Sequence, residues 1–295
     1  MTKKNILITG GDGMLASHLK EVFTLEGDEN IYCLNRSACD ITDIDSIERA
    51  VKQYQIDILI NTAAYTAVDL AETETACADK VNHLALNYIA KVASKYDVEV
   101  IHISTDYVFN GKNDTPYREE DPTSPVSIYG KTKCDGEVAL LKNHTKSIII
   151  RTSWLYDESH ANFFTTMIRM GRERDEISVV NDQFGTPTYA RDLAQAIHSI
   201  STKTNITEGQ RYGVFHFSNE GETTWYDFAH EIFQNIGLTC TIHPVSTEQF
   251  VRPAQRPNFA VLDKTKIKFT FGITIPEWRR SLLNCIERFN LNIRN

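Results

Sequence analysis

The stretch "ILITGGDGMLA", residues 6–16, decides the fold of this 295-residue chain. A short apolar run leads into closely spaced glycines, and helix-forming residues follow directly. Two registers fit a glycine-turn pattern: Gly11, Gly13 and Ala16 match G-x-G-x-x-A, while Gly10, Gly13 and Ala16 match G-x-x-G-x-x-A. In either register the glycines let the backbone approach a pyrophosphate at the N-terminus of the following helix. The stretch therefore predicts the first strand, turn and helix of a dinucleotide-binding fold.

Apolar runs and amphipathic segments alternate along the chain around this turn. Strands are expected at 5–10, 30–35, 57–64, 99–105 and 147–153, and helices at 14–26, 43–55, 72–95 and from 127 onward. Asp43 precedes the second helix as its expected N-cap. The expected strands are almost continuously apolar, as in a parallel sheet that is buried on both faces. We therefore expect a doubly wound α/β fold of the Rossmann type.

The pattern continues beyond residue 175 and then becomes irregular. A strand at 176–182, a helix at 189–200 and a strand at 214–218 are expected, and residues 243–263 hold three of the eight prolines. That proline-rich segment is typical of an irregular binding region. We expect a Rossmann domain at 1–150 with later returns near 176–235, and a smaller substrate-binding lobe at about 151–175 and 236–295.

Composition narrows the class of protein. The formal net charge of -8 argues against nucleic acid as a partner. No apolar run approaches the roughly 20 residues that a membrane-spanning helix needs, and the apolar run near the N-terminus is too short for a signal peptide. The six cysteines are scattered, without metal-ligand spacing. They indicate reduced thiols in a cytoplasmic protein and no metal site.

The end of the second expected strand bears on the choice of cofactor. An acidic residue there would bind the 2′-hydroxyl of NAD, whereas an arginine accommodates the 2′-phosphate of NADP. The chain has Arg36 at this point and no acidic residue before Asp40. This favours NADPH, with NADH left open, and Asp40 and Ile41 are expected beside the adenine. The alternative is that Arg36 is a solvated loop cation.

The motif "YGKTK" supplies the candidate chemistry. Tyr129 and Lys133 lie four residues apart, so both side chains should share one helix face. The lysine cation would favour phenolate and lower the pKa of the tyrosine. Thr105 ends the fourth expected strand, where its hydroxyl would meet a substrate oxygen. These three groups beside a nicotinamide suit transfer of hydride and proton between a carbonyl and an alcohol, although a core ring and a surface cation would also explain the pair.

Several blocks in order resemble extended short-chain dehydrogenases/reductases and, within them, the dTDP-4-dehydrorhamnose reductase family. The blocks are "NTAAYTAVDLAE" (61–72), "STDYVFNG" (104–111), "SIYGKTKCDGE" (127–137), "RTSWLY" (151–156), "NFFTTMIRMGRE" (162–173), "VVNDQFGTPTYARDLA" (179–194), "FHFSNEGETTWYDFAHEI" (215–232) and "RPAQRP" (252–257). The Tyr-x-x-x-Lys motif alone marks only the superfamily. Its combination with "DQFGTPT" and the tryptophan of "RTSWLY" is much more specific.

The resemblance implies roles for particular residues. Tyr129 would donate a proton, Lys133 would hold the nicotinamide ribose, and Thr105 would be the third catalytic member. Cofactor contacts are implied at Gly10, Gly13, Met14, Leu15, Ala63, Ala64 and Tyr65. The expected reaction is the NADPH-dependent reduction of dTDP-4-dehydro-L-rhamnose to dTDP-L-rhamnose for polysaccharide biosynthesis.

The resemblance also implies where the nucleotide sugar binds. Tyr107 and Trp154 would line the sugar pocket, although aromatics near a strand end are often core residues. Arg252 and Arg256 would cover the nucleotide-sugar, with guanidinium groups suited to phosphate, although a solvated loop would also explain them.

The chain departs from the family pattern at three places. Ala16 and Asp157 stand where glycine is usual, and Asp157 follows directly on "WLY". Some members dimerise around a magnesium held by glutamates near the first helix. Here His18 lies near the expected acidic position, so we expect no magnesium in this chain. The sequence does not decide whether the protein forms a homodimer.

Four functions compete at this stage. The first is the 4-keto reductase, and the second is an epimerase or dehydratase of a nucleotide sugar. Dehydratases carry Thr-Asp-Glu after the fourth strand, and Tyr107 in the third position disfavours them here. The third is a reductase of a different sugar, which Asp157 keeps open. The fourth is a non-catalytic binding subunit, which would be expected to lose Thr105, Tyr129 and Lys133.

Overall fold

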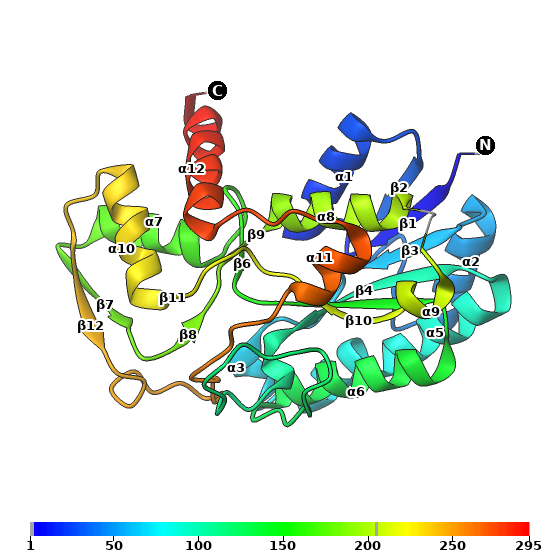
Figure 1. Cartoon of the computed structure of the whole chain (residues 1–295), viewed down its shortest axis with the longest axis horizontal. Coiled ribbons are helices and arrows are strands. Elements are labelled where there is room, and N and C mark those ends of the chain that lie inside the picture. Colours follow the sequence, from blue (N-terminus) through cyan, green and yellow to red (C-terminus); the bar gives the residue numbers. More distant parts are fainter. Residues whose placement is uncertain (1–2, 204–205, 295) are drawn as a thin grey trace.

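A six-stranded parallel sheet forms the centre of the fold (Figure 1), in a computed structural model that describes residues 3–203 and 206–294. Its strands are β1 (Asn5–Thr9), β2 (Asn30–Leu34), β3 (Ile58–Asn61), β4 (Glu99–Thr105), β5 (Ser147–Thr152) and β10 (Gly213–His216). They lie in the order β2-β1-β3-β4-β5-β10, and every neighbouring pair is parallel. The five strands predicted before residue 153 are all present.

Helices cover both faces of this sheet. One layer consists of α1 (Met14–Glu26), α8 (Ala190–Thr202) and α11 (Thr265–Phe271), and the other of α2 (Ile44–Tyr54), α5 (Ala85–Tyr96) and α6 (Ile128–Asn143). Side chains alternate along β1, so Ile6 and Ile8 pack against the first layer while Leu7 packs against the second. Burial on both faces explains the continuous apolar strands, and the predicted doubly wound fold is confirmed.

The helix predicted at 72–95 is instead built from several short pieces. They are α4 (Thr75–Asp79), the π-helical turn η1 (Lys80–Leu84) and α5, and a separate short helix, α3 (Val68–Ala71), precedes them. Asn82 in η1 accepts a hydrogen bond from the Tyr65 amide at 2.9 Å and donates one to the Tyr65 carbonyl at 3.1 Å. A π-turn inserts an extra residue into the helix and often occurs at functional sites. Here it ties the loop after β3 to α6, because Asn82 also donates to Thr132 at 3.2 Å.

A smaller group of elements lies beside the carboxyl end of the sheet (Figure 1). The helices α7 (Phe163–Glu173), α10 (Trp225–Ile236) and α12 (Trp278–Arg294) share an aromatic core with β7 (Glu176–Val180). β7 pairs in parallel with β12 (Thr241–Val245), not with the central sheet as the continuing pattern suggested. By strand pairing, β10 joins β5 in the central sheet, whereas β7 joins β12 outside it. The predicted domain limits themselves stay a prediction.

The remaining elements are short. They are η2 (Asp106–Val108), β6 (Leu155–Tyr156), β8 (Phe184–Gly185), β9 (Thr188–Tyr189), α9 (Glu208–Arg211) and β11 (Thr223–Thr224). The short strands form two separate pairings, β6 with β9 in parallel and β8 with β11 antiparallel. Among residues 3–203 and 206–294, each helix is too short or too polar to cross a bilayer.

Candidate active site

A cavity of about 900 Å³ opens at the carboxyl ends of β1 to β5. The strand order reverses between β1 and β3, which is where ligands bind in open α/β sheets. The structure brings all the predicted cofactor residues to this cavity: Gly10, Gly13, Met14, Leu15, Arg36, Asp40, Ile41, Ala63, Ala64, Tyr65, Tyr129 and Lys133. Thr105, Tyr107 and Trp154 line the same cavity.

The glycine turn is shaped for a dinucleotide. Gly10 has φ +72°, and a Cβ there would lie 2.9 Å from the Ala63 amide nitrogen, so only glycine fits between β1 and β3. Gly13 is the N-cap of α1 and brings no side chain to bond the free amides of the first turn, which also contains no acidic residue. These amides and the positive end of the helix dipole fit a pyrophosphate.

Arg36 lies at the rim of the cavity. Its Nε is 3.3 Å from Oδ2 of Asp40, and 78% of its side chain is exposed. Oδ1 of Asp40 accepts hydrogen bonds from the Thr42 amide and hydroxyl at 2.9 and 2.8 Å. Burial alone would raise the pKa of Asp40, but these bonds and Arg36 outweigh it and lower the pKa. Asp40 thus orients Arg36 at the cavity mouth.

The glycine of "YGKTK" allows α6 to approach η2 closely. A Cβ on Gly130 would lie 2.2 Å from the carbonyl oxygen of Tyr107. This contact places the Tyr129 ring edge-on to the Tyr107 ring, with centroids 5.4 Å apart and planes at 77°. Thr105 ends β4 and is the N-cap of η2, where its hydroxyl accepts from the Tyr107 amide at 3.2 Å and donates to Asp106 Oδ1 at 2.9 Å. A hydroxyl and a phenol therefore meet on one wall of the cavity.

The prediction that Lys133 lowers the pKa of Tyr129 was wrong. Burial raises the pKa of Tyr129 to about 12, and a contact with the Thr105 hydroxyl only partly opposes this. The amine of Lys133 points to the end of β4, where Nζ donates to the Ile103 carbonyl at 2.6 Å and lies 3.2 Å from His102 Nε2. The phenol is therefore held in its protonated form, as a proton donor requires.

Asp106 is a buried acid that sequence reasoning missed. It lines the cavity beside Thr105, and its Oδ2 finds no hydrogen-bond partner within the part of the chain that the structure describes. Burial raises its pKa to about 7, although the Thr105 hydroxyl and backbone amides act in the opposite direction. Its position within "STDY", directly after a predicted catalytic threonine, was the signal that could have identified it.

An aromatic pair forms the opposite wall. Trp154 follows β5 and stacks on Trp225 of α10, with centroids 3.6 Å apart and planes at 11°. A Cβ on Gly185 would lie 2.6 Å from the Trp154 ring, so the glycine of "DQFGTPT" makes room for the indole. Trp154 has φ +47°, a conformation that bulky residues rarely adopt and that often occurs at ligand sites. Trp225 was not predicted, and its block "TTWYDF" was the available signal.

A second cavity of about 1040 Å³ adjoins the first, and Trp225 lines both. Arg252 and Arg256 line the second cavity and not the first. Asp69 in α3 binds Arg256 through both carboxylate oxygens, at 3.0 and 3.1 Å, and lies 3.7 Å from Arg252. Because only 22% of the Arg256 side chain is exposed, it is a fixed group and not a solvated loop cation.

Two of the departures from the family pattern are in contact. His18 Nε2 lies 3.3 Å from Oδ2 of buried Asp157. Asp157 does not line the cavity but caps the turn that follows, where it accepts from the His160 amide at 2.8 Å and bonds the His160 ring at 2.6 Å. His160 does line the cavity. Asp157 therefore affects the pocket through His160.

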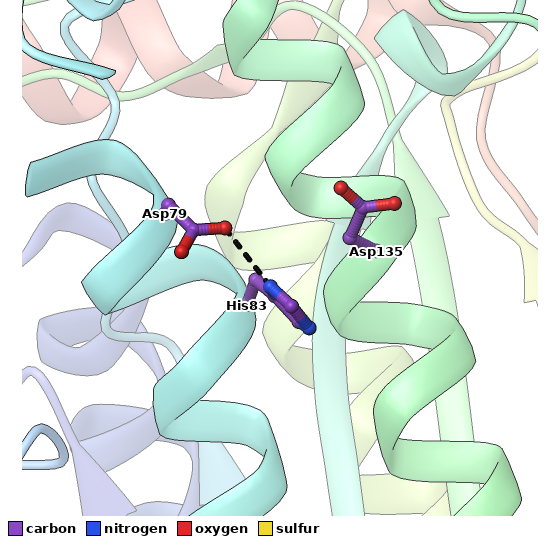
Figure 2. A group of neighbouring side chains, drawn as sticks. All are labelled: Asp79, His83 and Asp135. Atoms are coloured by element: carbon purple, nitrogen blue, oxygen red, sulfur yellow. Dashed lines mark hydrogen bonds and ion pairs between the residues drawn. The ribbon is translucent and has the colours of Figure 1, made fainter. Parts of the chain in front are cut away.

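A separate group of side chains lies outside both cavities. Asp79, His83 and Asp135 come from α4, η1 and α6, and one ligand atom from each lies within 4.8 Å of the others (Figure 2). His83 Nδ1 is hydrogen-bonded to Asp79 at 2.9 Å. All three side chains are partly exposed. The absence of a metal, expected from the sequence, stays a prediction.

Comparison with known proteins agrees with this geometry. A family model described as the RmlD substrate binding domain matches residues 4–291. A dTDP-4-dehydrorhamnose reductase of Aggregatibacter actinomycetemcomitans is 38% identical over 95% of this chain and 97% of its own length. The Bacillus subtilis spore coat polysaccharide biosynthesis protein SpsK is also 38% identical, over 97% of this chain and 98% of its own.

A solved structure shows the same likeness in three dimensions. The dTDP-4-dehydrorhamnose reductase of Bacillus anthracis, crystallised in complex with NADP, superposes with a TM-score of 0.90. It is 36% identical, and the match covers 97% of this chain and all of that one. Sequence and structure thus agree over nearly the full length. The chain belongs to the dTDP-4-dehydrorhamnose reductase family.

Proposed function

We propose that the protein is an NADPH-dependent reductase that converts dTDP-4-dehydro-L-rhamnose to dTDP-L-rhamnose. The observation that carries this proposal is one cavity in which the glycine turn, Thr105, Tyr129 and Lys133 meet the stacked pair Trp154 and Trp225. The turn fits a dinucleotide, and the aromatic wall fits a sugar ring. The Bacillus anthracis relative was crystallised with NADP, and NADPH bound at the same place in this chain would supply hydride to C4 of the sugar.

Residues of the chain would donate the proton that the reduction needs. We assign Tyr129 as the donor to the oxygen at C4, because burial keeps its hydroxyl protonated at working pH. Thr105 would hydrogen-bond the same oxygen and orient it toward the phenol. Lys133, near the end of β4, would hold the nicotinamide ribose and place a cation near the developing negative charge. Water would be kept out by Trp154 and Tyr107.

The second cavity would hold the nucleotide half of the substrate. Arg252 and Arg256 supply cationic groups for the diphosphate, and Asp69 fixes their orientation. Trp225 connects the two cavities, so one substrate can place its sugar in the first and its nucleotide in the second. We place the enzyme in the cytoplasm, because its scattered cysteines suit a reducing compartment.

A dehydratase is disfavoured by the same geometry. Elimination of water from the sugar needs an added acid and base, and Tyr107 stands where dehydratases carry the glutamate of Thr-Asp-Glu. Burial raises the pKa of this tyrosine above its usual value, so its hydroxyl stays protonated and does not accept a proton. Reduction needs only the one proton donor that Tyr129 supplies.

A panel of nucleotide sugars tests the proposal. The purified protein is mixed with NADPH and each sugar, and loss of NADPH absorbance is followed. We expect turnover with dTDP-4-dehydro-L-rhamnose and at least about a hundredfold lower kcat/KM with a UDP-linked or 3-keto analogue, since misplaced substrates lose this much. Turnover of every 4-keto sugar at equal rates would refute the substrate assignment, and no turnover of any would refute the reductase.

A further inference from the structure

A continuous row of buried polar side chains lies behind the active site. Thr9, Asn61 and His102 come from the neighbouring strands β1, β3 and β4, and Lys133 comes from α6. Each of the four is at most 2% exposed. Thr9 donates to Asn61 at 2.6 Å, the Asn61 amide lies 3.0 Å from His102 Nδ1, and His102 Nε2 lies 3.2 Å from Lys133 Nζ. Polar groups buried to this degree have fixed hydrogen-bonding roles.

The neighbours of Asn61 fix the orientation of its amide. Its nitrogen faces the Ala63 carbonyl oxygen at 3.4 Å, and a carbonyl can only accept a hydrogen bond. Its oxygen faces the Thr9 hydroxyl, which donates to it at 2.6 Å. The amide nitrogen is thus on the side of His102, where it donates its second hydrogen to Nδ1. His102 must accept at this nitrogen.

The tautomer of His102 follows from this contact. Burial lowers the pKa of His102 well below its usual value, and the nearby charge of Lys133 lowers it further, so the ring is neutral and carries one proton. With Nδ1 accepting from Asn61, that proton lies on Nε2. The Nε2–H group then points at the amine of Lys133, 3.2 Å away.

Such an N–H favours the neutral form of the lysine. A neutral amine has a lone pair that can accept from His102 while the amine donates to the Ile103 carbonyl, 2.6 Å from Nζ. An ammonium group has no lone pair, so its hydrogens would face the hydrogen of His102. The row of side chains therefore destabilises the charged form of Lys133.

We propose that Asn61 and His102 are positioning residues that hold an N–H against Lys133 and so make the charged form of this lysine less stable than that of an ordinary lysine. The inference rests on the proposed reductase function, in which Lys133 is the cation beside the reacting oxygen. Neither Asn61 nor His102 lines the cavity. They would act on the reaction only through the charge of Lys133.

The other groups near Lys133 do not cancel this effect. Burial lowers the pKa of Lys133 to about 8, and Glu137 on the same helix opposes the shift. Arg151 of β5 binds Glu137 at 2.7 Å, and Ser104 of β4 also donates to it, so much of its charge is already balanced. Tyr129 on α6 and both Asp106 and Tyr107 on η2 also belong to this wall, and burial raises the pKa of all three.

The proposal fixes how activity depends on pH. A lysine whose pKa is lowered to about 8 is charged below that pH and neutral above it. If the reaction needs the cation, kcat should fall as the pH rises through about 8. An ordinary lysine, with a pKa near 10.4, would keep the enzyme active about two units higher.

Nitrogen-15 NMR of the histidine rings tests the tautomer without substrate. The full-length protein is labelled at histidine, and the His102 signals are assigned by triple-resonance spectra and checked against His102→Gln. We expect Nε2 to carry the proton and Nδ1 to accept throughout the pH range in which the protein is folded. A proton on Nδ1, or on both nitrogens, would overturn the proposal even if the protein proves to be an active reductase.

The substitution Asn61→Asp is designed to reverse the tautomer. A carboxylate can only accept, so His102 would move its proton to Nδ1 and its Nε2 would accept from the Lys133 ammonium. We expect the alkaline fall in kcat to move up by about one pH unit or more. The control Thr9→Val removes a hydroxyl from the same row but leaves the contact between the Asn61 amide and the Ala63 carbonyl. The tautomer of His102 and the pH profile should therefore be the same as in the unmodified protein.

The tautomer and the pH profile of the variant are interpreted together. A reversed tautomer with an unmoved pH profile would refute the link to Lys133, and a moved profile with an unchanged tautomer would refute the role of His102. Circular dichroism and melting temperature verify that Asn61→Asp is folded. If it is not folded, the tautomer of the unmodified protein still decides the proposal.

Discussion

The two walls of the candidate active site are built in opposite ways. On the wall of β1, β3, β4 and α6, the reactive groups are buried and bonded to their neighbours before any substrate arrives, as Lys133 and Thr105 illustrate. On the other wall, Trp154 and Trp225 come from segments far apart in sequence, stack on one another and present their rings to the open cavity. We propose that the first wall sets the rate of the chemistry, while the second selects and holds the substrate.

The largest effect is expected on the first wall, from Tyr129→Phe. This change removes only the hydroxyl, and loss of a general acid typically lowers the rate by 10²–10⁴-fold. We expect kcat to fall by at least about a hundredfold, with NADPH affinity and melting temperature nearly unchanged. Steady-state kinetics measure kcat, and fluorescence titration measures the affinity for NADPH. The control Tyr54→Phe, at a ring that stacks on Tyr32 outside the cavity, should keep full activity.

The next largest effect is expected from Lys133→Met. Loss of the buried amine should lower kcat by about a hundredfold and weaken NADPH binding by about tenfold, since a lost contact worth about 1.4 kcal/mol gives that factor. The exposed Lys131 on the same helix supplies the control Lys131→Met, which should leave both quantities unchanged. The double variant with Tyr129→Phe should lose far less than the product of the single losses, because the residues act as a unit. If the loss in the double variant equals the product of the single losses, Tyr129 and Lys133 act independently, which would contradict their action as a unit.

Arg36→Ala should produce a smaller effect, confined to the choice of cofactor. Hydrogen bonds to charged groups are worth about 1.5–3 kcal/mol, so the preference for NADPH over NADH should shrink by tenfold or more. Affinities for both cofactors, measured by titration calorimetry, test this. Arg49, an exposed arginine paired with Asp43 outside the cavity, gives the matched control Arg49→Ala. Equal affinities for the two cofactors in the unmodified protein would refute the role of Arg36.

The smallest effect is expected on the second wall, from Trp154→Ala. An aromatic contact is worth about 0.5–1.5 kcal/mol beyond its buried area, so KM for the nucleotide sugar should rise about three- to tenfold. NADPH affinity should stay close to that of the unmodified protein. The control Phe269→Ala removes a ring that is 86% exposed and lies in neither cavity. A change in kcat alone, without a change in KM, would erase the distinction between the two walls.

Sequence patterns predicted the first wall far better than the second. The glycine turn, the ends of β2 and β4, and the spacing of Tyr129 and Lys133 are local features, so their positions followed from strand and helix periodicity. Trp225 stacks on Trp154 across 71 residues of chain, and Asp69 binds Arg256 across 187. Such contacts depend on tertiary packing, which periodicity does not encode.

The pKa values in the site and the direction of the Lys133 amine could not be predicted from the sequence either. The four-residue spacing placed Lys133 on the face of Tyr129, but the direction of its amine depends on the Ile103 carbonyl of a different element. The pKa values of Tyr129 and Asp106 depend mainly on burial, which only the folded structure reveals. The π-turn at Asn82 likewise arises from a contact with a distant loop.

Transfer of a labelled hydride tests the proposed reduction at C4 itself. The protein is given dTDP-4-dehydro-L-rhamnose and NADPH that carries deuterium at the transferable position of its nicotinamide, and the product is examined by mass spectrometry and NMR. The account predicts dTDP-L-rhamnose with one deuterium at C4, and at least about a hundredfold slower label transfer in Tyr129→Phe. Deuterium at another carbon, or none in the sugar, would contradict it.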